Sequence, residues 1–173
     1  RYDHIQILKR FTEKTKDDLN LEGLSGALVN AAAAAMDSRG AYLLLPETPT
    51  GEYTTFIYAG QQPVNGLTFA VNSALVTTMQ QQGIIDSTDM ETIPSLLALT
   101  AYEQNIIRLN SIELMVPLRN EGELVGILFL TDKHSGELYT HEERRLLMKA
   151  ASDVAANMRN ATRFESLKQG HNK

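Results

Sequence analysis

Two apolar segments in the last third of the chain restrict its fold more than any other feature of the sequence. Residues 113–119 and 124–132 have the length and composition of buried strands, and the sequence Asn-Glu-Gly-Glu separates them. Gly122 can adopt the positive φ that a tight hairpin turn needs. The pattern predicts an antiparallel hairpin at the centre of a sheet.

Alternation along this hairpin divides its side chains into two sets that point to opposite faces. One set contains Met115, Pro117, Ile127, Phe129 and Thr131. The other set contains Leu114, Val116, Leu128 and Leu130. Because both faces carry apolar side chains, each needs a covering layer of helices.

Helical periodicity occupies the first forty residues. Apolar side chains recur through Ile5, Leu8 and Leu19, and a second helix follows Asn20. We expect this second helix to stop before Gly40, which can adopt the left-handed cap conformation.

A long helix closes the chain. Thr140 and Glu143 have the spacing of a capping box, in which each side chain satisfies the other residue's backbone N–H. We expect the helix to extend to about Leu167 and to end at Gly170.

The middle of the chain has shorter and less regular patterns. The expected strands are residues 41–45, 53–58, 67–71 and 84–86. The expected helices extend from a cap at Asn72 or Ser73 to Gly83, and from Thr92 and Pro94 through Gln104.

This order predicts the α+β class, because strands and helices do not alternate regularly. We expect a central antiparallel sheet of five or six strands, with the terminal helices on one face and the middle helices on the other. Residues 1–173 form one domain, in which residues 1–20 and 160–173 are signalling or dimerisation extensions. Since the chain begins at Arg1 rather than Met, we interpret it as a segment of a longer protein, and the interpretation leaves membrane spans upstream open.

Composition argues against several classes of function. The net charge is −5 and no basic stripe is present, so nucleic acid is not an expected partner. The chain has no cysteine and its four histidines lack ligand spacing, so we expect no metal site. No apolar run is long enough to cross a bilayer, and the absence of cysteine fits a cytoplasmic location.

Several motifs together resemble the GAF domain family. They are MVPLR at residues 115–119, EGELVGIL at 121–128, YTHEERRLL at 139–147 and Asn-Ala at 160–161. The resemblance implies a regulatory sensor domain of a signalling protein, such as a sensor histidine kinase of a two-component system, joined to an output domain in the same chain. It does not imply an enzyme, and no Ser-His-Asp set or phosphate-binding glycine loop is present.

The resemblance also bears on cofactors. Relatives that attach a bilin, or that reduce methionine sulfoxide, use cysteine, which this chain lacks. Relatives that bind haem need an axial histidine near the pocket, and no histidine here has such a position. We therefore expect no haem, no covalent pigment and no other cofactor.

A signature of cyclic-nucleotide-binding relatives is only partly present. Its positions are Asp132, Lys133, Tyr139, Glu143 and Arg144, and the last of these reverses the charge. An ion pair between Lys133 and Glu143 would join the strand end to the helix start. We expect this pair to face solvent and to contribute under about 1 kcal/mol.

The resemblance implies a ligand pocket between the sheet and the middle helices. From alternation we expect a small apolar or aromatic ligand to be lined by Tyr42, Leu44, Phe56, Tyr58, Phe69, Asp86, Thr100, Met115, Ile127 and Phe129. The alternative is that these side chains form an ordinary core.

The terminal helices carry an apolar stripe that one sheet is too short to cover. It contains Ile5 and Leu8 of the first helix and Met158, Ala161 and Phe164 of the last. We expect a parallel homodimer through these helices. Two functions remain open: a sensor whose ligand shifts the helices, and a ligand-free structural or dimerisation module.

Overall fold

A computed structural model describes residues 2–16 and 20–171, with side chains for residues 5–16 and 20–163. A six-stranded antiparallel sheet forms its centre, in the order β3-β2-β1-β6-β5-β4. The strands are β1 (Gly40–Glu47), β2 (Glu52–Gly60), β3 (Thr68–Phe69), β4 (Ile85–Asp86), β5 (Ile112–Asn120) and β6 (Glu123–Thr131). The predicted class and the strand number are confirmed.

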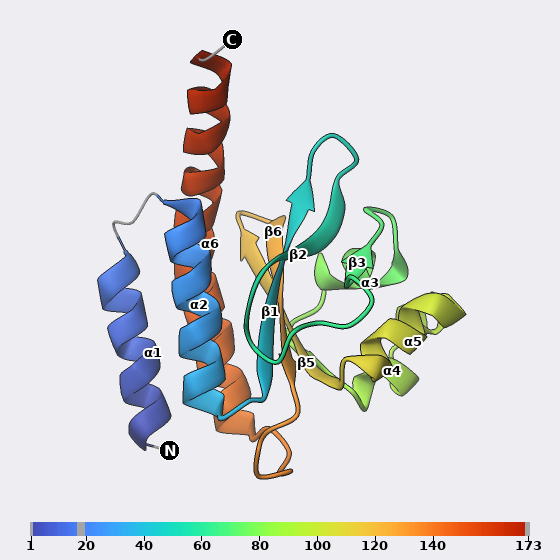
Figure 1. Ribbon diagram of the computed structural model, residues 1–173. Helices are drawn as coiled ribbons and strands as arrows, with labels where there is room; N and C mark the ends of the chain where they lie inside the picture. The colour runs from blue at the N-terminus through green and yellow to red at the C-terminus, as the bar shows by residue number, and fades with distance from the viewer. Residues whose placement is uncertain (1, 17–19, 172–173) are drawn as a thin grey trace.

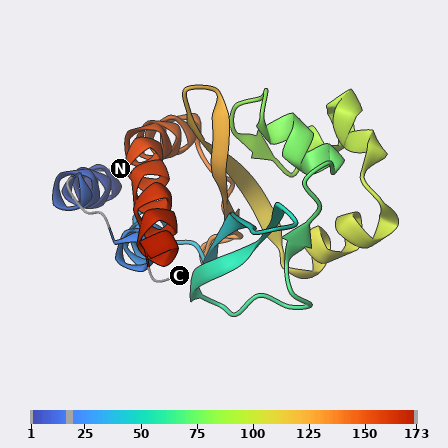
Figure 2. The same cartoon turned by 90° about the horizontal axis from the view of Figure 1, so that it is seen from above.

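Two groups of helices cover the two faces of the sheet (Figure 1). On one side are α1 (Tyr2–Thr15), α2 (Leu21–Met36) and α6 (His141–His171). On the other are α3 (Ala74–Met79), α4 (Asp89–Thr92), the 3₁₀ helix η1 (Pro94–Ala98) and α5 (Ala101–Leu109). Viewed from above, α2 and α6 lie between the sheet and α1, which forms an outer layer (Figure 2).

The central hairpin has the predicted division of faces. Leu128 and Leu130 belong to the core under α2 and α6, together with Leu114 and Val116 of β5. Phe129 belongs to the core under the middle helices. The turn places both Glu121 and Gly122 at positive φ, 51° and 81°, which is the conformation of the tightest hairpin turns.

Gly126 lies where β6 passes close to β1. A Cβ at this position would lie 3.0 Å from Cδ2 of Leu45 and 3.2 Å from the carbonyl oxygen of Leu44. A side chain would therefore push β6 away from β1.

The ends of the helices show which capping predictions were right. Asn20 caps α2 by accepting a hydrogen bond from the Gly23 N–H at 2.8 Å, and Ser73 caps α3 by accepting one from the Val76 N–H at 3.1 Å. Our assignment of the left-handed cap to Gly40 was wrong. Asp37 adopts that conformation, with φ of 56°, so that β1 can begin at Gly40.

The middle elements are shorter than predicted. The third strand is only Thr68–Phe69, and α3 ends at Met79 rather than at Gly83. The single helix that we predicted from Thr92 to Gln104 is three elements, because the backbone is extended at Ile93 and again at Leu99. At the other end of the chain, α6 continues through Gly170 to His171. Leu19 lies outside the described residues.

Candidate functional site

The predicted pocket lining is partly assembled on the sheet face below the middle helices. Six of its ten residues belong to one buried cluster, and each is at most 1% exposed: Tyr42, Leu44, Phe69, Met115, Ile127 and Phe129. We call them the sheet-face cluster. The rings of Phe69 and Phe129 meet edge to face with centroids 5.9 Å apart, a favourable aromatic contact. These side chains fill the space between them as a packed core does.

Tyr42 contributes a phenol to this cluster. Burial, followed by the charge of Asp132 and by Tyr58, raises the pKa of Tyr42 to about 12. The hydroxyl is therefore neutral at physiological pH, and the cluster presents no charge to a ligand.

Two polar residues that we placed near the pocket lie elsewhere. Asp86 pairs with Leu114 across β4 and β5, so its side chain lies on the α6 side of the sheet, where it contacts Arg144 at 2.6 Å. Burial alone would raise the pKa of Asp86, but hydrogen bonds and the charge of Arg144 lower it. Thr100 is exposed, and its hydroxyl caps α5 by accepting a hydrogen bond from the Glu103 N–H at 3.0 Å.

Phe56 and Tyr58 are only half-covered, with exposed fractions of 44% and 42%. The pairing of β1 with β2 shifts between Leu43 and Leu44, which leaves Phe56 as the extra residue of a bulge. Simple alternation therefore could not place Phe56 correctly.

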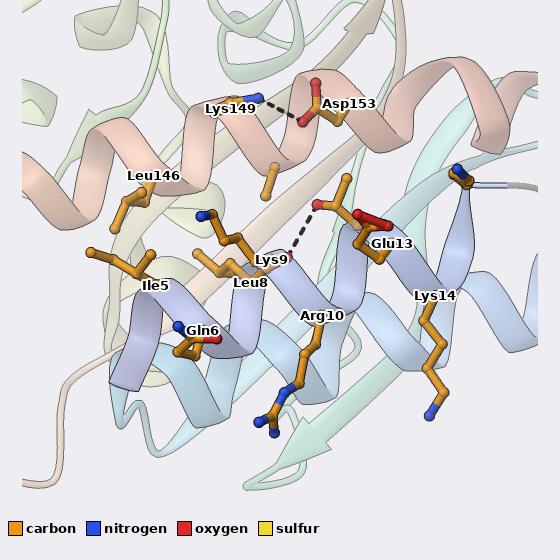
Figure 3. A pocket seen from close by; sticks show the side chains of 13 residues that line it. Ile5, Gln6, Leu8, Lys9, Arg10, Glu13, Lys14, Leu146, Lys149 and Asp153 are labelled. Atoms are coloured by element: carbon orange, nitrogen blue, oxygen red, sulfur yellow. Dashed lines mark hydrogen bonds and ion pairs between the residues drawn. The ribbon is translucent and has the colours of Figure 1, made fainter. Parts of the chain in front are cut away.

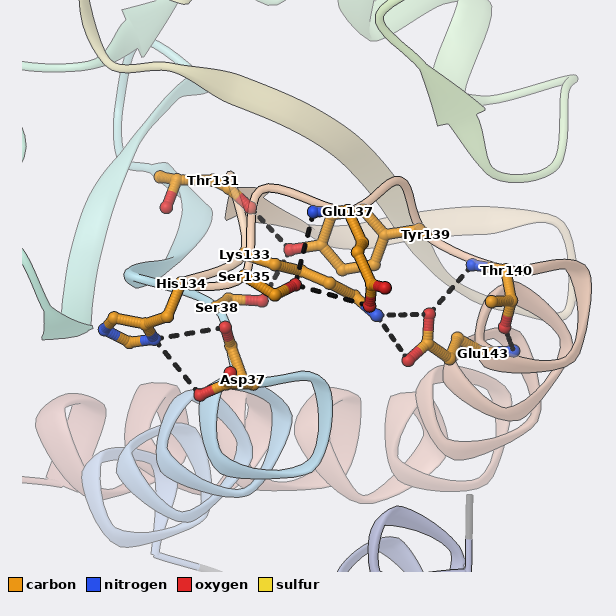
Figure 4. A network of polar contacts seen from close by, with 10 residues as sticks. All are labelled: Asp37, Ser38, Thr131, Lys133, His134, Ser135, Glu137, Tyr139, Thr140 and Glu143. Atoms are coloured by element: carbon orange, nitrogen blue, oxygen red, sulfur yellow. Dashed lines mark hydrogen bonds and ion pairs between the residues drawn. The ribbon is translucent and has the colours of Figure 1, made fainter.

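A polar network lies where β6 passes into α6, and we call it the α6 junction: Ser38, Lys133, Tyr139, Thr140 and Glu143 (Figure 4). Ser38, Lys133 and Glu143 are buried, Tyr139 is partly buried and Thr140 is exposed. Lys133 Nζ contacts both carboxylate oxygens of Glu143, at 2.7 and 2.6 Å. The two side chains are 8% and 7% exposed, so our expectation of a solvent-facing pair was wrong. The predicted capping box is present, with Glu143 Oε1 2.8 Å from the Thr140 N–H and Thr140 Oγ1 3.1 Å from the Glu143 N–H.

Hydrogen bonding keeps the carboxylate of the junction ionised. Burial would raise the pKa of Glu143, but hydrogen bonds from Lys133 and Thr140 and the charge of Lys133 hold it below its usual value. The Lys133 ammonium also lies 5.3 Å from the centre of the Tyr139 ring, within cation–π range.

Tyr139 joins three separate segments of the chain at this junction. Its hydroxyl donates to the carbonyl of Thr131 and contacts Ser38 Oγ, at 2.5 Å in each case. An isolated β-bridge also pairs Ser38 with Lys133. No local sequence pattern marks Ser38, because its partners Tyr139 and Lys133 lie about a hundred positions away. The junction thus ties the end of α2 and the end of β6 to the start of α6.

A groove of about 1030 Å³ lies between α1 and α6 on the outer helix layer (Figure 3). Ile5 and Leu146 line its apolar part, while Lys9, Glu13 and Lys149 bring charges to it. Leu8 also lines it, although this side chain is only 5% exposed within one copy of the chain. Phe164, the other residue that we expected on a dimer stripe, has a side chain outside the described residues.

A family model for the GAF domain matches residues 18–159, which include every strand, all of α2, the middle helices and the part of α6 up to Arg159. The chain belongs to the GAF domain family. No match was found among curated proteins.

Solved GAF domains have the same fold at low sequence identity. The GAF domain of a phosphoenolpyruvate-protein phosphotransferase from Coxiella burnetii is 20% identical, with a TM-score of 0.70 over 94% of this chain and 96% of that one. The corresponding domain from Acinetobacter is 16% identical, with a TM-score of 0.69 over 94% and 96%. A free methionine-R-sulfoxide reductase from Neisseria meningitidis, solved with its substrate, is 14% identical, with a TM-score of 0.63 over 92% and 90%. These similarities show the fold that this GAF domain shares with them.

GAF domains occur in signalling proteins such as phosphotransferases and chemotaxis proteins. Within the part of this domain that the structure describes, no helix is long and apolar enough to cross a bilayer.

Proposed function

We propose that this GAF domain is a non-catalytic regulatory module that passes conformational changes along α6 to an output domain in the same chain. The observation that carries the proposal is the α6 junction. There, a buried ion pair and the Tyr139 hydroxyl fix the start of α6 to the sheet and to the end of α2. A displacement of β6 relative to α2 would therefore reach α6 directly.

The sheet-face cluster supports the ligand-free form of this function. Its six side chains are at most 1% exposed and leave no charged group facing the middle helices. A ligand between the sheet and these helices would have to displace packed aromatic and aliphatic side chains, which is unfavourable unless its own contacts replace theirs.

A second candidate function is sensing of a small molecule at the sheet-face cluster. It is favoured by the free methionine-R-sulfoxide reductase from Neisseria meningitidis, an enzyme of similar fold that was solved in complex with its substrate. A thermal-shift screen with aromatic metabolites and nucleotides distinguishes the ligand-free module from the small-molecule sensor. A stabilisation that depends on concentration and is lost in Met115→Trp would support the sensor, whereas stabilisation that Met115→Trp leaves unchanged would place the ligand elsewhere.

We further propose that two copies associate in parallel through the α1–α6 groove, which would place the two α6 helices side by side. Ile5 and Leu146 are partly exposed there. Sedimentation should give about twice the 19.2 kDa mass of one chain. Ile5→Glu with Leu146→Glu should give folded single copies, whereas Leu138→Glu, at a site that is 80% exposed outside the groove, should leave the assembly intact.

A single copy in the unmodified protein would contradict the association. A dimer that persists in the double variant would move the interface away from the groove. The identity of the output domain, for which the family resemblance implies a sensor histidine kinase only as one example, stays open.

A further inference from the structure

A second hollow, of about 480 Å³, lies on the α6 side of the sheet rim. Its walls come from the β1–β2 and β5–β6 hairpins, from the first residue of α2 and from α6. This volume is within the usual range for small-molecule sites. The hollow is separate from the sheet-face cluster, which lies on the opposite side of the sheet.

One part of the hollow is apolar. Pro46 and Val125 contribute aliphatic surface beside the edges of the buried Leu45 and Leu124, and Phe56 adds an aromatic ring. Phe56 is 44% exposed because the β2 bulge turns it out of the core. An exposed aromatic side chain beside aliphatic surface can bury the apolar body of a small ligand.

The opposite wall, on α6, carries two guanidinium groups. Arg159 is 21% exposed and contacts Glu123 Oε1 at 2.9 Å, so its charge already has a partner. Arg163 follows four residues later, so it lies one turn further along the same face of the helix, and it is exposed. The other acidic side chain that lines the hollow is Glu47, at the exposed end of β1.

Hydroxyl groups complete the polar part of the hollow: Thr48, Thr54, Thr55 and Thr162. Thr162 donates its hydroxyl hydrogen to the carbonyl of Met158 at 2.9 Å, and Thr55 donates to the carbonyl of Leu67 at 3.2 Å. Arg163 therefore provides the strongest hydrogen-bond donors available to an anion here, and its planar fork matches a carboxylate.

We propose that this hollow binds a small organic carboxylate with an apolar body. The carboxylate binds the Arg163 guanidinium, and the apolar body packs against Phe56 and Leu45. Such a ligand bridges the tip of the β1–β2 hairpin and the part of α6 that carries Arg163. Binding therefore couples the sheet rim to α6, although the site itself does not depend on the relay proposed above.

The probes for a first test are 3-phenylpropionate and its neutral amide, 3-phenylpropanamide. Backbone-amide NMR titration of the intact chain should show saturable shifts with the carboxylate in β1, β2 and α6 around the hollow. The neutral amide should bind at least about tenfold more weakly, because it cannot form charge-assisted hydrogen bonds with Arg163.

Three variants test the assignment of the groups. Arg163→Gln should weaken binding of 3-phenylpropionate about tenfold or more, whereas Arg145→Gln, at an exposed arginine of α6 outside the hollow, should not change it. Glu47→Gln should tighten binding, since it removes a negative charge from the lining. Equal binding of the acid and the amide, unchanged binding in Arg163→Gln, shifts clustered elsewhere or no saturable shift at all would each overturn the proposal.

Discussion

Replacing Lys133 with Met should destabilise the domain strongly, because it removes the ammonium group that contacts both oxygens of the buried Glu143 carboxylate. The Lys133 and Glu143 side chains are 8% and 7% exposed, and Lys133 Nζ contacts both carboxylate oxygens. Breaking a buried ion pair by removing one partner typically costs about 3–5 kcal/mol. For a domain of this size, such a loss lowers the melting temperature by roughly 6–20 °C.

The assay is urea and thermal unfolding of Lys133→Met, Glu143→Leu and the double variant. The double variant should lose less stability than the two single variants added together, because it removes both charges at once. Lys149→Met is the matched control. It breaks a pair with Asp153 that has a similar distance, 3.0 Å, but is 73% and 38% exposed, so it should cost only about 0.3–0.5 kcal/mol. Equal, small losses in Lys133→Met and Lys149→Met would refute the reasoning.

Three further predictions follow from the core and the junction. The pKa of Glu143 is lowered in the folded state. Its contribution to the free energy of unfolding is therefore complete above its ordinary pKa of about 4.5 and is lost as the pH falls through the lower folded pKa. The urea midpoint of the unmodified domain should therefore fall on acidification, and the midpoint of Glu143→Gln should fall less steeply. Parallel curves of urea midpoint against pH for the two proteins would contradict this. Gly126→Val should cost about 1–3 kcal/mol, because its Cβ would lie 3.2 Å from the backbone of β1, whereas a Cβ at Gly83 meets nothing within 4 Å, so Gly83→Val should cost less. Equal melting curves for these two variants would rule out the close approach. Leu128→Asp, at a site that is 1% exposed, should cost about 4 kcal/mol or more, and Leu138→Asp, at 80%, should have little effect. Similar melting temperatures for that pair would show that the faces of β6 are assigned wrongly.

Local patterns predicted the regular parts of this fold. The hairpin alternation placed Leu128 and Phe129 on opposite faces, and the capping signals at Asn20 and Thr140 marked two helix starts. These features depend on residues that are neighbours along the chain or across one tight turn.

The errors lie where distant residues decide the structure. Phe56 is exposed because β2 bulges against β1, and periodicity does not reveal the extra residue. Asp86 lies on the other face because β4 pairs with β5 in a register that the two-residue strand could not indicate. The burial of Lys133 depends on Ser38 and Tyr139, which only the fold brings together. Whether a ligand binds the sheet-face cluster stays a prediction.

The outer position of α1 gives the domain two levels of stability. This helix packs on α2 and α6 rather than on the sheet, and the largest buried side chains among its described residues 5–15 are Leu8 and Phe11, each 5% exposed. Burial of two such side chains contributes about 3–6 kcal/mol. That is near or below the lower end of the global stability of domains, which is about 5–15 kcal/mol. Local unfolding of α1 can therefore precede global unfolding, so its amide hydrogens should exchange with solvent sooner than those of β1 and β6. In that opened form, the outer faces of α2 and α6 become accessible while the sheet stays intact.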